Sequence, residues 1–527
     1  MIILIFWILV LLVTLVLYHR KVYSRFAKQD VKHLPPFPIL GNLTDFILRK
    51  KHLVEQFDDL FNAFPDEKFV GRYEFVAPVL VVRDIELIKK ITVKDFEHFL
   101  DHRTLVDEKT DTLFGRNLFS LRSQEWKDMR STLSPAFTSS KMRAMVPFMS
   151  EVGDMMTDYL KEEIKKSGVD YVDVDCRDLT SRCANDVIAS CAFGLKVNSQ
   201  VDTNNEFYNI GKETSNLGFR ALLVFLGYAS FPGLMKLLSD KTSNFFRKII
   251  LDTMKEREKK NITRQDMIHL LMKAKKGNLT YDEKPVEKNT AGFAVVEESH
   301  IGQEAVNRDW SDDDLVAQAV VFFIAGFESM STAMSFLLYE MALNPDMQDR
   351  LAQEIKDHEI KTGGKFDFNS LQNLTYLDMV VSELLRRWPP GIAMSRECVK
   401  DYNMGPPNNQ SKKDYIIRKG DTLIIPVWQF HHNPEYFPEP IKFDPERFSE
   451  QNKHKIKPMT YIPFGLGPRN CIGSRFALCE IKVITYHLLK RTEVLPCEKT
   501  QIPAKIAPNS FPISIEGGHW LRFKVRQ

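Results

Sequence analysis

The sequence predicts a mainly α-helical fold with a small β-sheet region, preceded by a single N-terminal transmembrane helix. Three observations support this prediction. An uncharged apolar run occupies residues 1–18, and most of the remaining chain has helical patterning, most clearly over 312–338. Strand-like runs are few and short, and they cover residues 78–82, 415–418 and 422–427.

The first element is the apolar run MIILIFWILVLLVTLVLY at residues 1–18. As a helix it spans roughly 27 Å, close to the hydrocarbon thickness of a bilayer. A cleaved secretory signal would need basic residues before the run and a small-residue cleavage site after it, and neither is present. Basic residues follow the run instead, and they favour a cytosolic location for the chain that comes after the helix. These residues are Arg20, Lys21, Arg25 and Lys28. We therefore expect an uncleaved anchor.

The next segment, residues 19–41, is predicted to be a basic and proline-rich linker. Its three prolines within 35–38 fix the backbone in an extended spacer, and Gly41 then lets the chain turn. Residues 42–527 are expected to form one catalytic domain. Within it, the polar and acidic stretch 276–309 is expected to be a surface loop rather than a domain boundary. The interrupted apolar stretch 217–238 could belong to the core or to a second membrane-touching patch.

The composition excludes several classes of protein. Hydrophobic residues at 44% and charged residues at 27% are near globular averages, which argues against disorder and against a polytopic membrane protein. A formal net charge of +3 gives no electrostatic case for nucleic-acid binding. Seven cysteines, an odd number without short spacings, favour a reduced compartment with one or two functional thiols.

The central helix predicted at 312–338 carries three aspartates in its first turn, and Ser311 is a candidate N-cap. In its middle lies the sequence Ala-Gly-Phe-Glu-Ser, which ends at Ser329. A glycine beside a hydroxyl residue can open the helical hydrogen-bond ladder to water. The acid Glu328 next to an alcohol can then supply protons. The alternative is that Gly326 permits close packing and Glu328 forms a buried ion pair.

The strongest motif is FGLGPRNCIG at residues 464–473, followed by a predicted helix at 474–489. Its first two glycines permit a tight turn. Cys471 lies at the start of the helix, where the dipole and free amides are expected to lower the pKa of its thiol. Arg469 offers a fixed cation for a haem propionate, and Gly473 lets the backbone pass close to a flat ring.

The alternative for Cys471 is a buried, inert thiol. A chance match of the five defining positions is expected on the order of once in ten thousand chains of this length. Those positions are Phe464, Gly467, Arg469, Cys471 and Gly473. The motif therefore predicts a haem whose iron is bound by the Cys471 thiolate.

This segment resembles the haem-binding loop of the cytochrome P-450 superfamily, and two further motifs follow the order of that family. Glu383-Leu-Leu-Arg386 resembles its ExxR motif, and Pro-Glu-Arg447-Phe resembles its PERF motif. The resemblance implies a structural triad of Glu383, Arg386 and Arg447 that supports the haem pocket. The resemblance extends from the prolines within 35–38 to the C-terminus. It is closest to microsomal, detoxifying members such as insect xenobiotic-metabolising enzymes, and it implies the cytochrome P-450 fold.

The resemblance also implies residues that hold the haem. Trp126 and Arg130 form a WxxxR pattern, which in the family hydrogen-bonds a haem propionate. Arg396, expected on a strand after the ExxR helix, resembles another propionate ligand. Before the WxxxR helix this chain reads Asp-His102-Arg103, and either basic residue could take the role of an arginine found in many relatives. The implied cofactor-binding set is Trp126, Arg130, Arg396, Phe464, Arg469, Cys471 and Gly473, with Cys471 as the metal ligand.

The resemblance assigns catalysis to Glu328 and Ser329. The pentapeptide around them resembles the AGx[DE]T motif for oxygen activation, with serine in place of threonine. The hydroxyl is retained, so oxygen activation remains the expectation. A substrate pocket is implied around residues 105–118 and by a mostly apolar set: Ile324, Ala325, Ile392, Ala393, Met394, Ser510 and Phe511.

The implied function is that of a haem-thiolate monooxygenase. With heme b, O2 and NADPH-derived electrons it would insert one oxygen atom into small lipophilic substrates. Xenobiotics are the preferred substrate class, and an endogenous hormone or lipid is the alternative. The chain lacks a dinucleotide motif and a flavin domain, which implies NADPH–cytochrome P-450 reductase as partner, with a small b-type cytochrome as a second candidate. The implied location is the endoplasmic reticulum membrane, with the catalytic domain on the cytosolic face.

Two other functions compete with this one. An oxygen-independent haem-thiolate isomerase or dehydratase tends to lose the acid–alcohol pair that this chain keeps. A non-catalytic haem sensor usually needs an output domain, and no segment here is free to be one. Five lysines could form a basic docking face for a redox partner: Lys127, Lys141, Lys453, Lys455 and Lys482.

Overall fold

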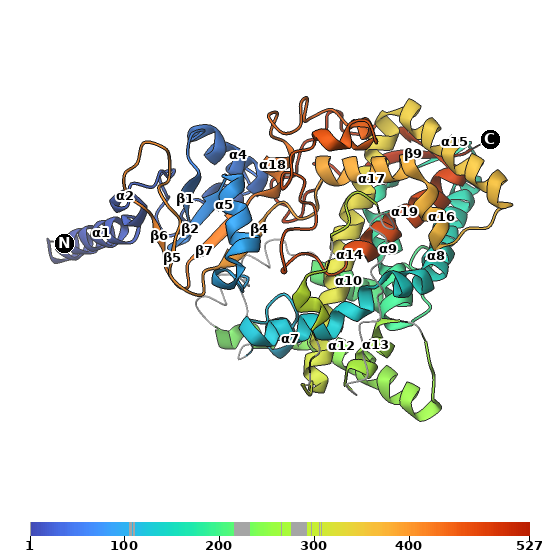
Figure 1. The fold of residues 1–527 in the computed structure, drawn as a ribbon, viewed down its shortest axis with the longest axis horizontal. Helices are drawn as coiled ribbons and strands as arrows, with labels where there is room; N and C mark the ends of the chain where they lie inside the picture. The colour runs from blue at the N-terminus through green and yellow to red at the C-terminus, as the bar shows by residue number, and fades with distance from the viewer. Residues whose placement is uncertain are drawn as a thin grey trace. The chain divides into compact units, whose positions relative to one another are not determined.

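The structure, a computed structural model, describes residues 2–104, 108, 111–215, 232–264, 266–275, 292–296, 298–304, 306 and 308–526. Figure 1 shows a mainly helical chain with small sheets, and this confirms the predicted helical fold with a small β-sheet region. The described chain folds into two compact units. The first comprises residues 1–103 and 392–430, and the second comprises 104–391 and 431–527.

The first unit is built on a four-stranded sheet in the order β1-β2-β7-β4. β1 and β2 pair antiparallel, β7 runs parallel to β2, and β4 pairs antiparallel with β7. Apolar residues of α4, β1 and β2 form a core cluster of Phe57, Leu60, Val70 and Val81. The strands are β1 (Phe69–Glu74), β2 (Ala77–Val82), β4 (Met394–Glu397) and β7 (Thr422–Ile425), with a separate pair β5 (Tyr402–Asn403) and β6 (Ile416–Ile417). The helices and helical turns are α1 (Ile2–Val22), α2 (Arg25–Lys28), α3 (Thr44–Ile47), α4 (Leu53–Ala63), α5 (Ile85–Lys89), η1 (Lys90–Lys94), η2 (Phe96–His98) and α18 (Val427–His431).

The second unit is mostly helical, with α14 through its centre against α9, and α19 packed on α8. Its three-stranded sheet has the order β3-β9-β8, with β3 (Tyr171–Asp175), β8 (Thr492–Pro496) and β9 (Trp520–Val525). Its longer helices are α7 (Ser123–Leu133), α8 (Ser139–Ser167), α9 (Cys176–Ile188), α10 (Glu206–Ser215), α12 (Pro232–Lys260), α13 (Met267–Lys275), α14 (Asp312–Leu343), α15 (Pro345–Thr362), α17 (Thr375–Arg387) and α19 (Ser474–Arg491). Its shorter ones are α6 (Thr112–Gly115), η3 (Ser134–Phe137), η4 (Ala189–Phe193), η5 (His300–Gln303), α16 (Phe368–Asn373), η6 (Pro445–Phe448) and η7 (Lys453–Lys455).

The central helix α14 begins where the sequence predicts. The Ser311 hydroxyl accepts a hydrogen bond from the Asp314 amide at 3.1 Å, and the Asp314 carboxylate accepts one from the Ser311 amide at 3.0 Å. This reciprocal capping satisfies two amides that the first turn leaves free. The helix continues past the predicted end to Leu343, two residues before Pro345. Among the described residues, α14 is the helix long and apolar enough to cross a membrane, and 61% of that window is buried inside the protein.

The predicted loop at 276–309 is partly packed. Residues 276–291, 297, 305 and 307 lie outside the described residues. In the remainder, Ala294 is buried, and the ring of Phe293 packs edge-on against Phe448 with 5.1 Å between the ring centroids. The expectation of a plain surface loop is therefore wrong for this part. The apolar stretch 217–238 lies outside the described residues, except for the backbone that begins α12.

Candidate active site

The cysteine motif forms a closed loop before α19. The Cys471 amide donates to the Phe464 carbonyl at 2.8 Å, and the Asn470 amide donates to the Gly467 carbonyl at 3.0 Å. Gly465 and Gly467 have φ angles of 82° and 70°, a left-handed conformation that favours glycine. The loop therefore places Cys471 three residues before the first helical residue, Ser474.

Cys471 differs from the other six cysteines, all of which the structure describes. Its side chain is exposed, whereas five others are buried and Cys497 is partly buried. Surrounding protein nevertheless removes much of its hydration, so burial raises the pKa of the Cys471 thiol. The Gly473 amide and the Arg130 guanidinium act in the opposite direction but do not outweigh burial. The expectation of a lowered pKa is therefore wrong for the thiol in this structure.

The middle of α14 has an accessible face. Val321, Ala325 and Ser329 follow one another at intervals of four residues, so they lie on one side of the helix. Ala325 is exposed and the other two are partly exposed, although the helix is mostly buried before and after them. The Ser329 hydroxyl donates to the Ala325 carbonyl at 2.6 Å. A hydroxyl that bonds to the preceding turn in this way loosens the backbone ladder locally.

Phe137 connects this helix to the cysteine loop. Its ring packs edge-on against that of Phe322 on α14, with 5.4 Å between the centroids. A methyl group added at Gly473 would lie 3.8 Å from the same ring. The thiol loop and the accessible part of α14 therefore share Phe137 as a neighbour.

Trp126 and Arg469 lie against each other beside the loop. The Arg469 guanidinium lies 4.0 Å from the centre of the Trp126 ring, a cation–π distance. It also donates to the carbonyl oxygens of Leu118 at 3.2 Å and Leu121 at 2.7 Å. These contacts attach the loop to α7 and to the segment before it.

Arg130, one helical turn after Trp126, binds the residue before the thiol. Its guanidinium donates to the Asn470 carbonyl at 2.8 Å and to the Asn470 side-chain oxygen at 2.7 Å. On its other side it pairs with Glu298 at 2.7 Å. Glu298 was missed by the sequence analysis because it lies in the stretch expected to be a surface loop.

The predicted triad residues are in contact. Glu383 and Arg386 are fully buried and form two hydrogen bonds, of 2.7 and 2.8 Å. Arg447 lies 3.5 Å from the same carboxylate, which also accepts the Asp444 amide at 2.8 Å. Arg386 further donates to the carbonyl oxygens of His431 at 2.9 Å and Lys442 at 3.2 Å. This network ties α17 to the segment that contains the PERF motif.

His431 was also missed by the sequence analysis. It is fully buried, and its Nε2 accepts the Ile462 amide at 2.9 Å. Burial first, and the Arg386 guanidinium second, lower the pKa of His431 to about 3. The neutral ring therefore orders the backbone two residues before Phe464.

Replacing His431 with glutamine should weaken the acid sensitivity of the fold. The folded pKa of about 3 lies below the unfolded value near 6.5, so this histidine loses stabilising effect as pH falls from about 6.5 toward 3. The slope it adds approaches about 1.4 kcal/mol per pH unit well below the unfolded pKa and is smaller close to that pKa. Urea unfolding at pH 6, 5.5 and 5 should show a slope smaller by about 1 kcal/mol per pH unit in His431→Gln. The exposed His300→Gln variant should keep the wild-type slope, and an equal slope in both variants would contradict the assignment.

The remaining predicted haem residues belong to the first unit. Arg396 lies on β4 and is fully buried, and burial lowers its pKa to about 10. His102 contacts the Ser395 carbonyl through Nδ1 at 2.9 Å, and Arg103 forms an ion pair with Glu74. The Arg396 guanidinium donates to the Ser395 carbonyl at 2.8 Å.

The predicted pocket residues are distributed over both units. In the second unit, Ile324 and Ala325 lie on α14. Phe511, near the C-terminus of the same unit, is 57% exposed. The neighbouring Ser510 hydroxyl donates to the Pro512 carbonyl at 2.6 Å. Residues 105–107, 109 and 110 lie outside the described residues. The first unit holds three partly buried members: Ile392, Ala393 and Met394.

One of the five lysines does not fit a docking face. Lys482 is buried, and its ammonium group lies 2.7 Å from the Asp378 carboxylate. This expectation was wrong because α19 turns that side chain into the protein. Lys453 and Lys455 remain accessible, and each contacts a neighbour within the same turn.

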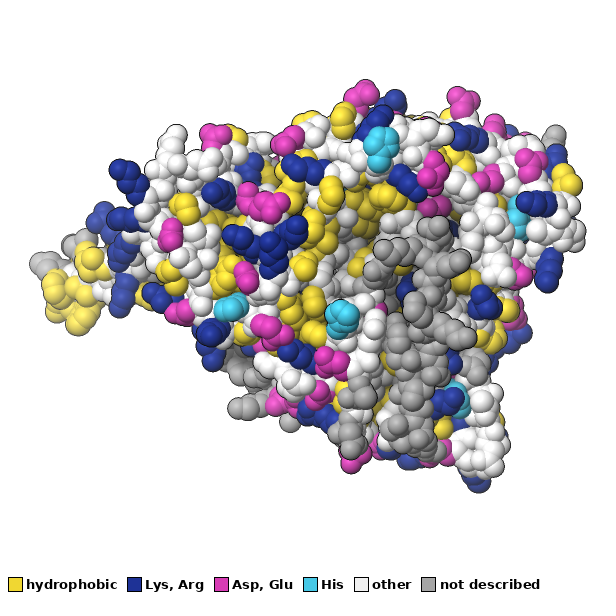
Figure 2. Space-filling view, viewed as in Figure 1, with side chains coloured by type: hydrophobic (Ala, Val, Ile, Leu, Met, Phe, Trp, Pro, Cys, Tyr) yellow, Lys and Arg dark blue, Asp and Glu magenta, His cyan; other side chains and the backbone are white. Residues whose placement is uncertain are grey.

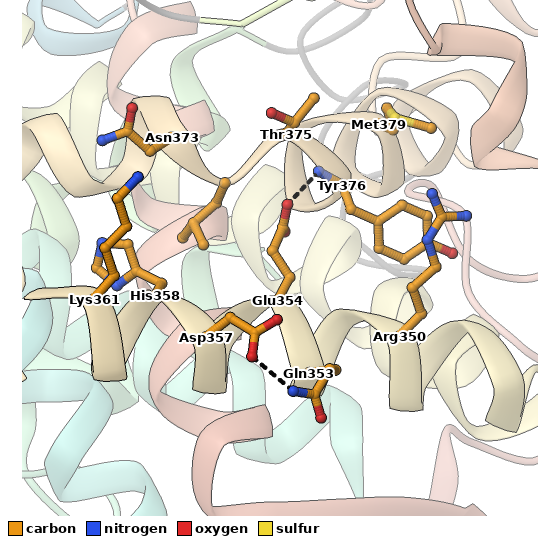
Figure 3. A pocket seen from close by; sticks show the side chains of 11 residues that line it. Arg350, Gln353, Glu354, Asp357, His358, Lys361, Asn373, Thr375, Tyr376 and Met379 are labelled. Atoms are coloured by element: carbon orange, nitrogen blue, oxygen red, sulfur yellow. Dashed lines mark hydrogen bonds between the residues drawn. The ribbon is translucent and has the colours of Figure 1, made fainter.

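A separate cavity of about 570 Å³ lies between α15, α16 and α17 (Figure 3). Glu354 reaches across it and accepts the amides of Tyr376 at 2.7 Å and Leu377 at 2.9 Å. It thus caps α17, whose own N-cap residue Leu374 offers no side-chain acceptor. None of the predicted site residues lines this cavity, whose lining is Arg350, Gln353, Glu354, Asp357, His358, Lys361, Asn373, Leu374, Thr375, Tyr376 and Met379.

Comparison with known proteins agrees with these motifs over nearly the whole chain. The sequence profile of the family described as Cytochrome P450 matches residues 32–521. The chain belongs to the cytochrome P450 family. It is a P450 monooxygenase, and it is similar to insect members of the family. It is 44% identical over 518 residues to cytochrome P450 9e2 of Blattella germanica, covering 95% of this chain and 94% of the relative.

Two further relatives show how far the similarity extends. Probable cytochrome P450 9f2 of Drosophila melanogaster is 40% identical over 514 residues, which cover 95% of each chain. Cytochrome P450 6k1 of Blattella germanica is 35% identical over 528 residues, covering 98% of this P450 and 96% of the relative. The similarity therefore includes the N-terminal region as well as the cysteine loop.

Membership of the family implies a haem with a thiolate ligand, and the residues of this P450 fit such a group. Cys471 offers an accessible sulfur, and Gly473, two residues later, has no side chain to obstruct a flat ring. Arg130 and Arg469 supply buried guanidinium groups beside the same loop. This donor set, one soft sulfur with cations close by, matches an iron porphyrin that carries propionates.

Proposed function

We propose that this P450 inserts one oxygen atom from O2 into small lipophilic molecules, xenobiotics foremost, with electrons from NADPH delivered by a partner reductase. The supporting observation is the combination in one unit of an accessible Cys471 thiol and the accessible face of α14. That face carries Ala325 and Ser329, with Glu328 beside them. A monooxygenase needs an acid–alcohol pair for proton delivery, whereas an oxygen-independent isomerase does not need one.

The haem, when bound, would supply oxygen activation and the oxidation of unreactive C–H bonds. Cys471 would hold its iron through sulfur. Trp126, Arg130 and Arg469 would hold its propionates. Phe464 and Gly473 would leave room for the ring. These assignments rest on the loop geometry and on the guanidinium groups described above.

The side chains of α14 would manage protons and water. The Ser329 hydroxyl, held 2.6 Å from the Ala325 carbonyl, can turn on its Cα–Cβ bond to donate a proton elsewhere. Glu328 is partly exposed and can exchange protons with solvent. Protons would thus pass from solvent to Glu328 and then to Ser329.

The substrate class follows from the lining. Nearly all candidate pocket residues are apolar, and such a surface binds molecules by removing hydrophobic area from water. Small lipophilic compounds fit this lining better than charged metabolites. In the second unit these residues are Ile324, Ala325 and Phe511.

The membrane assignment rests on α1. Apolar side chains of this helix are exposed, among them Phe6, Trp7, Val13 and Leu17, and basic residues occupy its last turn (Figure 2). Such a surface is stable in lipid and costly in water. We therefore assign residues 1–18 to a single-pass anchor in the endoplasmic reticulum membrane and 19–41 to a linker. Residues 42–527 form the haem-thiolate catalytic domain on the cytosolic face.

The partner follows from the same arrangement. NADPH–cytochrome P-450 reductase is the expected donor at that membrane, with a small b-type cytochrome as a second source of electrons. Accessible lysines such as Lys453 and Lys455 would offer such a donor positive charge.

Isotope incorporation tests this function. The full chain in lipid vesicles, with reductase and NADPH, should convert a panel of lipophilic compounds under ¹⁸O2 to products that carry one ¹⁸O atom. Omission of reductase should abolish the products. A protein that rearranges hydroperoxides without O2 or NADPH, and oxidises nothing in the complete system, would contradict the proposal.

A further inference from the structure

Glu298, in the segment before α14, forms a two-point contact with Arg130 on α7. Its carboxylate accepts one hydrogen bond from Arg130 Nε at 3.1 Å and one from Nη2 at 2.7 Å. The side chains of Arg130 and Glu298 are 3% and 12% exposed, so little solvent screens the two charges from each other. The contact therefore fixes the orientation of the guanidinium and also balances its charge.

The same guanidinium holds the residue that precedes the thiol. Arg130 Nη1 donates to the Asn470 carbonyl at 2.8 Å, and Nη2 donates to the Asn470 side-chain oxygen at 2.7 Å. Together with the bonds to Glu298, these contacts use four of the five N–H donors that a guanidinium has. Glu298 thus lies on one side of Arg130, and the backbone beside Cys471 lies on the other.

The position of Glu298 is fixed by its own segment. The short helix η5 packs against α7, and the Ser131 hydroxyl of α7 donates to the Ile301 carbonyl of η5. The Ser299 amide donates to the Glu298 carboxylate at 3.1 Å. Gly302 is buried, and a methyl group added there would collide with the same carboxylate. The segment is therefore packed so that the carboxylate faces Arg130.

We propose that Glu298 is a positioning residue for the haem site, which holds the Arg130 guanidinium against Asn470, offsets its positive charge beside Cys471 and so keeps the reduction potential of the bound haem low. This inference rests on the haem-thiolate part of the proposed function. The Glu298 carboxylate is bonded to Arg130 and to the Ser299 amide rather than to Cys471, so it acts on the site through Arg130.

The direction of the effect follows from electrostatics. A positive charge near a haem iron favours the form that carries one more electron, and groups outside the ligand shell tune the potential in this way. Without the Glu298 carboxylate, the charge of Arg130 beside the thiol loop is no longer balanced. The reduction potential is therefore expected to rise.

Three variants of the purified full chain in lipid vesicles, without substrate or reductase, test the proposal. Glu298→Gln removes the charge but can still accept a hydrogen bond from Arg130, and Glu298→Asp keeps the charge. Glu304→Gln is the matched control, because it removes the same charge from an exposed side chain at the end of η5. The midpoint potential of the haem is measured by spectroelectrochemical titration.

At the wild-type midpoint potential, the ratio of oxidised to reduced haem should fall about threefold or more in Glu298→Gln, which corresponds to a rise of about 28 mV for a one-electron couple. Glu298→Asp should return the midpoint toward the wild-type value, and Glu304→Gln should leave it unchanged. An unchanged or lower midpoint in Glu298→Gln, or an equal rise in Glu304→Gln, would overturn the proposal.

A second readout does not require bound haem. Thermal midpoints of the wild type, Glu298→Gln, Arg130→Gln and the double variant form a cycle. Glu298→Gln should destabilise the wild-type chain but have little further effect when Arg130 is already replaced. Equal effects in the two backgrounds would overturn the proposal. If the wild type lacks the red-shifted carbon monoxide band of a thiolate haem, the proposed function fails, and the thermal cycle still reports on Glu298.

Discussion

Replacing Glu383 with alanine is expected to lower the free energy of unfolding by about 3–5 kcal/mol and to abolish the haem-containing form of this P450. The side chains of Glu383 and Arg386 are both fully buried, so the variant leaves a buried guanidinium without its bidentate carboxylate. It also removes the acceptor of the Asp444 amide and the partner of Arg447. Haem content and thermal midpoint of the purified variant measure the effect.

The matched control is an ion pair on the surface of the same unit. Arg350 pairs with Glu446 at 2.6 Å, and the two side chains are 56% and 47% exposed. Water and salt screen such a pair, so Arg350→Gln should change stability by less than about 1 kcal/mol. If Glu383→Ala is as mild as Arg350→Gln, the triad does not support the haem pocket in this protein.

Replacing Ser329 with alanine or Glu328 with glutamine should lower product formation by about 100-fold or more, while haem content stays at the wild-type level. Both changes remove a group that holds or passes a proton, and neither removes a contact of the cysteine loop. NADPH consumption should continue, with its electrons recovered as hydrogen peroxide. The measurement is product and peroxide per NADPH at a fixed pH.

Ser335→Ala serves as the control for these two variants. Ser335 is buried on the same helix, and its hydroxyl donates to the Thr332 carbonyl at 3.0 Å. It lies away from the accessible face, so its loss should leave the ratio of product to NADPH unchanged. If Ser329→Ala forms as much product per NADPH as Ser335→Ala, then Ser329 is not part of the proposed proton path.

The elements that the sequence predicts best are those with a strong local pattern. The continuous apolar run, the three leading aspartates and Ser311 define the beginning of α14 correctly. Of the predicted strands, 78–82, 415–418 and 422–427 correspond to β2, β6 and β7. Strands β3 and β9 escaped prediction because they are short and alternate with charged residues. Their pairing joins residues that are far apart in the chain, such as Asp173 and Arg522.

In the candidate site too, residues in local motifs could be predicted, whereas contacts between distant parts of the chain could not. Cys471, Trp126 and Arg130 could be found from fixed local spacings within single motifs. Glu298 could not, because its contact with Arg130 joins residues 168 positions apart. Arg177 contacts Glu328 across 151 positions, and no residue near Arg177 in the sequence indicates that contact. His431 likewise acts through backbone groups that only the folded chain brings to it.

The reduced, carbon monoxide difference spectrum of the purified full chain tests the central claim most directly. We expect a strongly red-shifted Soret band, which is characteristic of a thiolate-ligated haem, and its loss in Cys471→Ala. Cys497 is partly buried, and Cys497→Ala serves as the control that should retain the band. A band at the position of neutral-histidine haems, or a protein that co-purifies with no haem, would contradict Cys471 as the ligand and the monooxygenase proposal that depends on it.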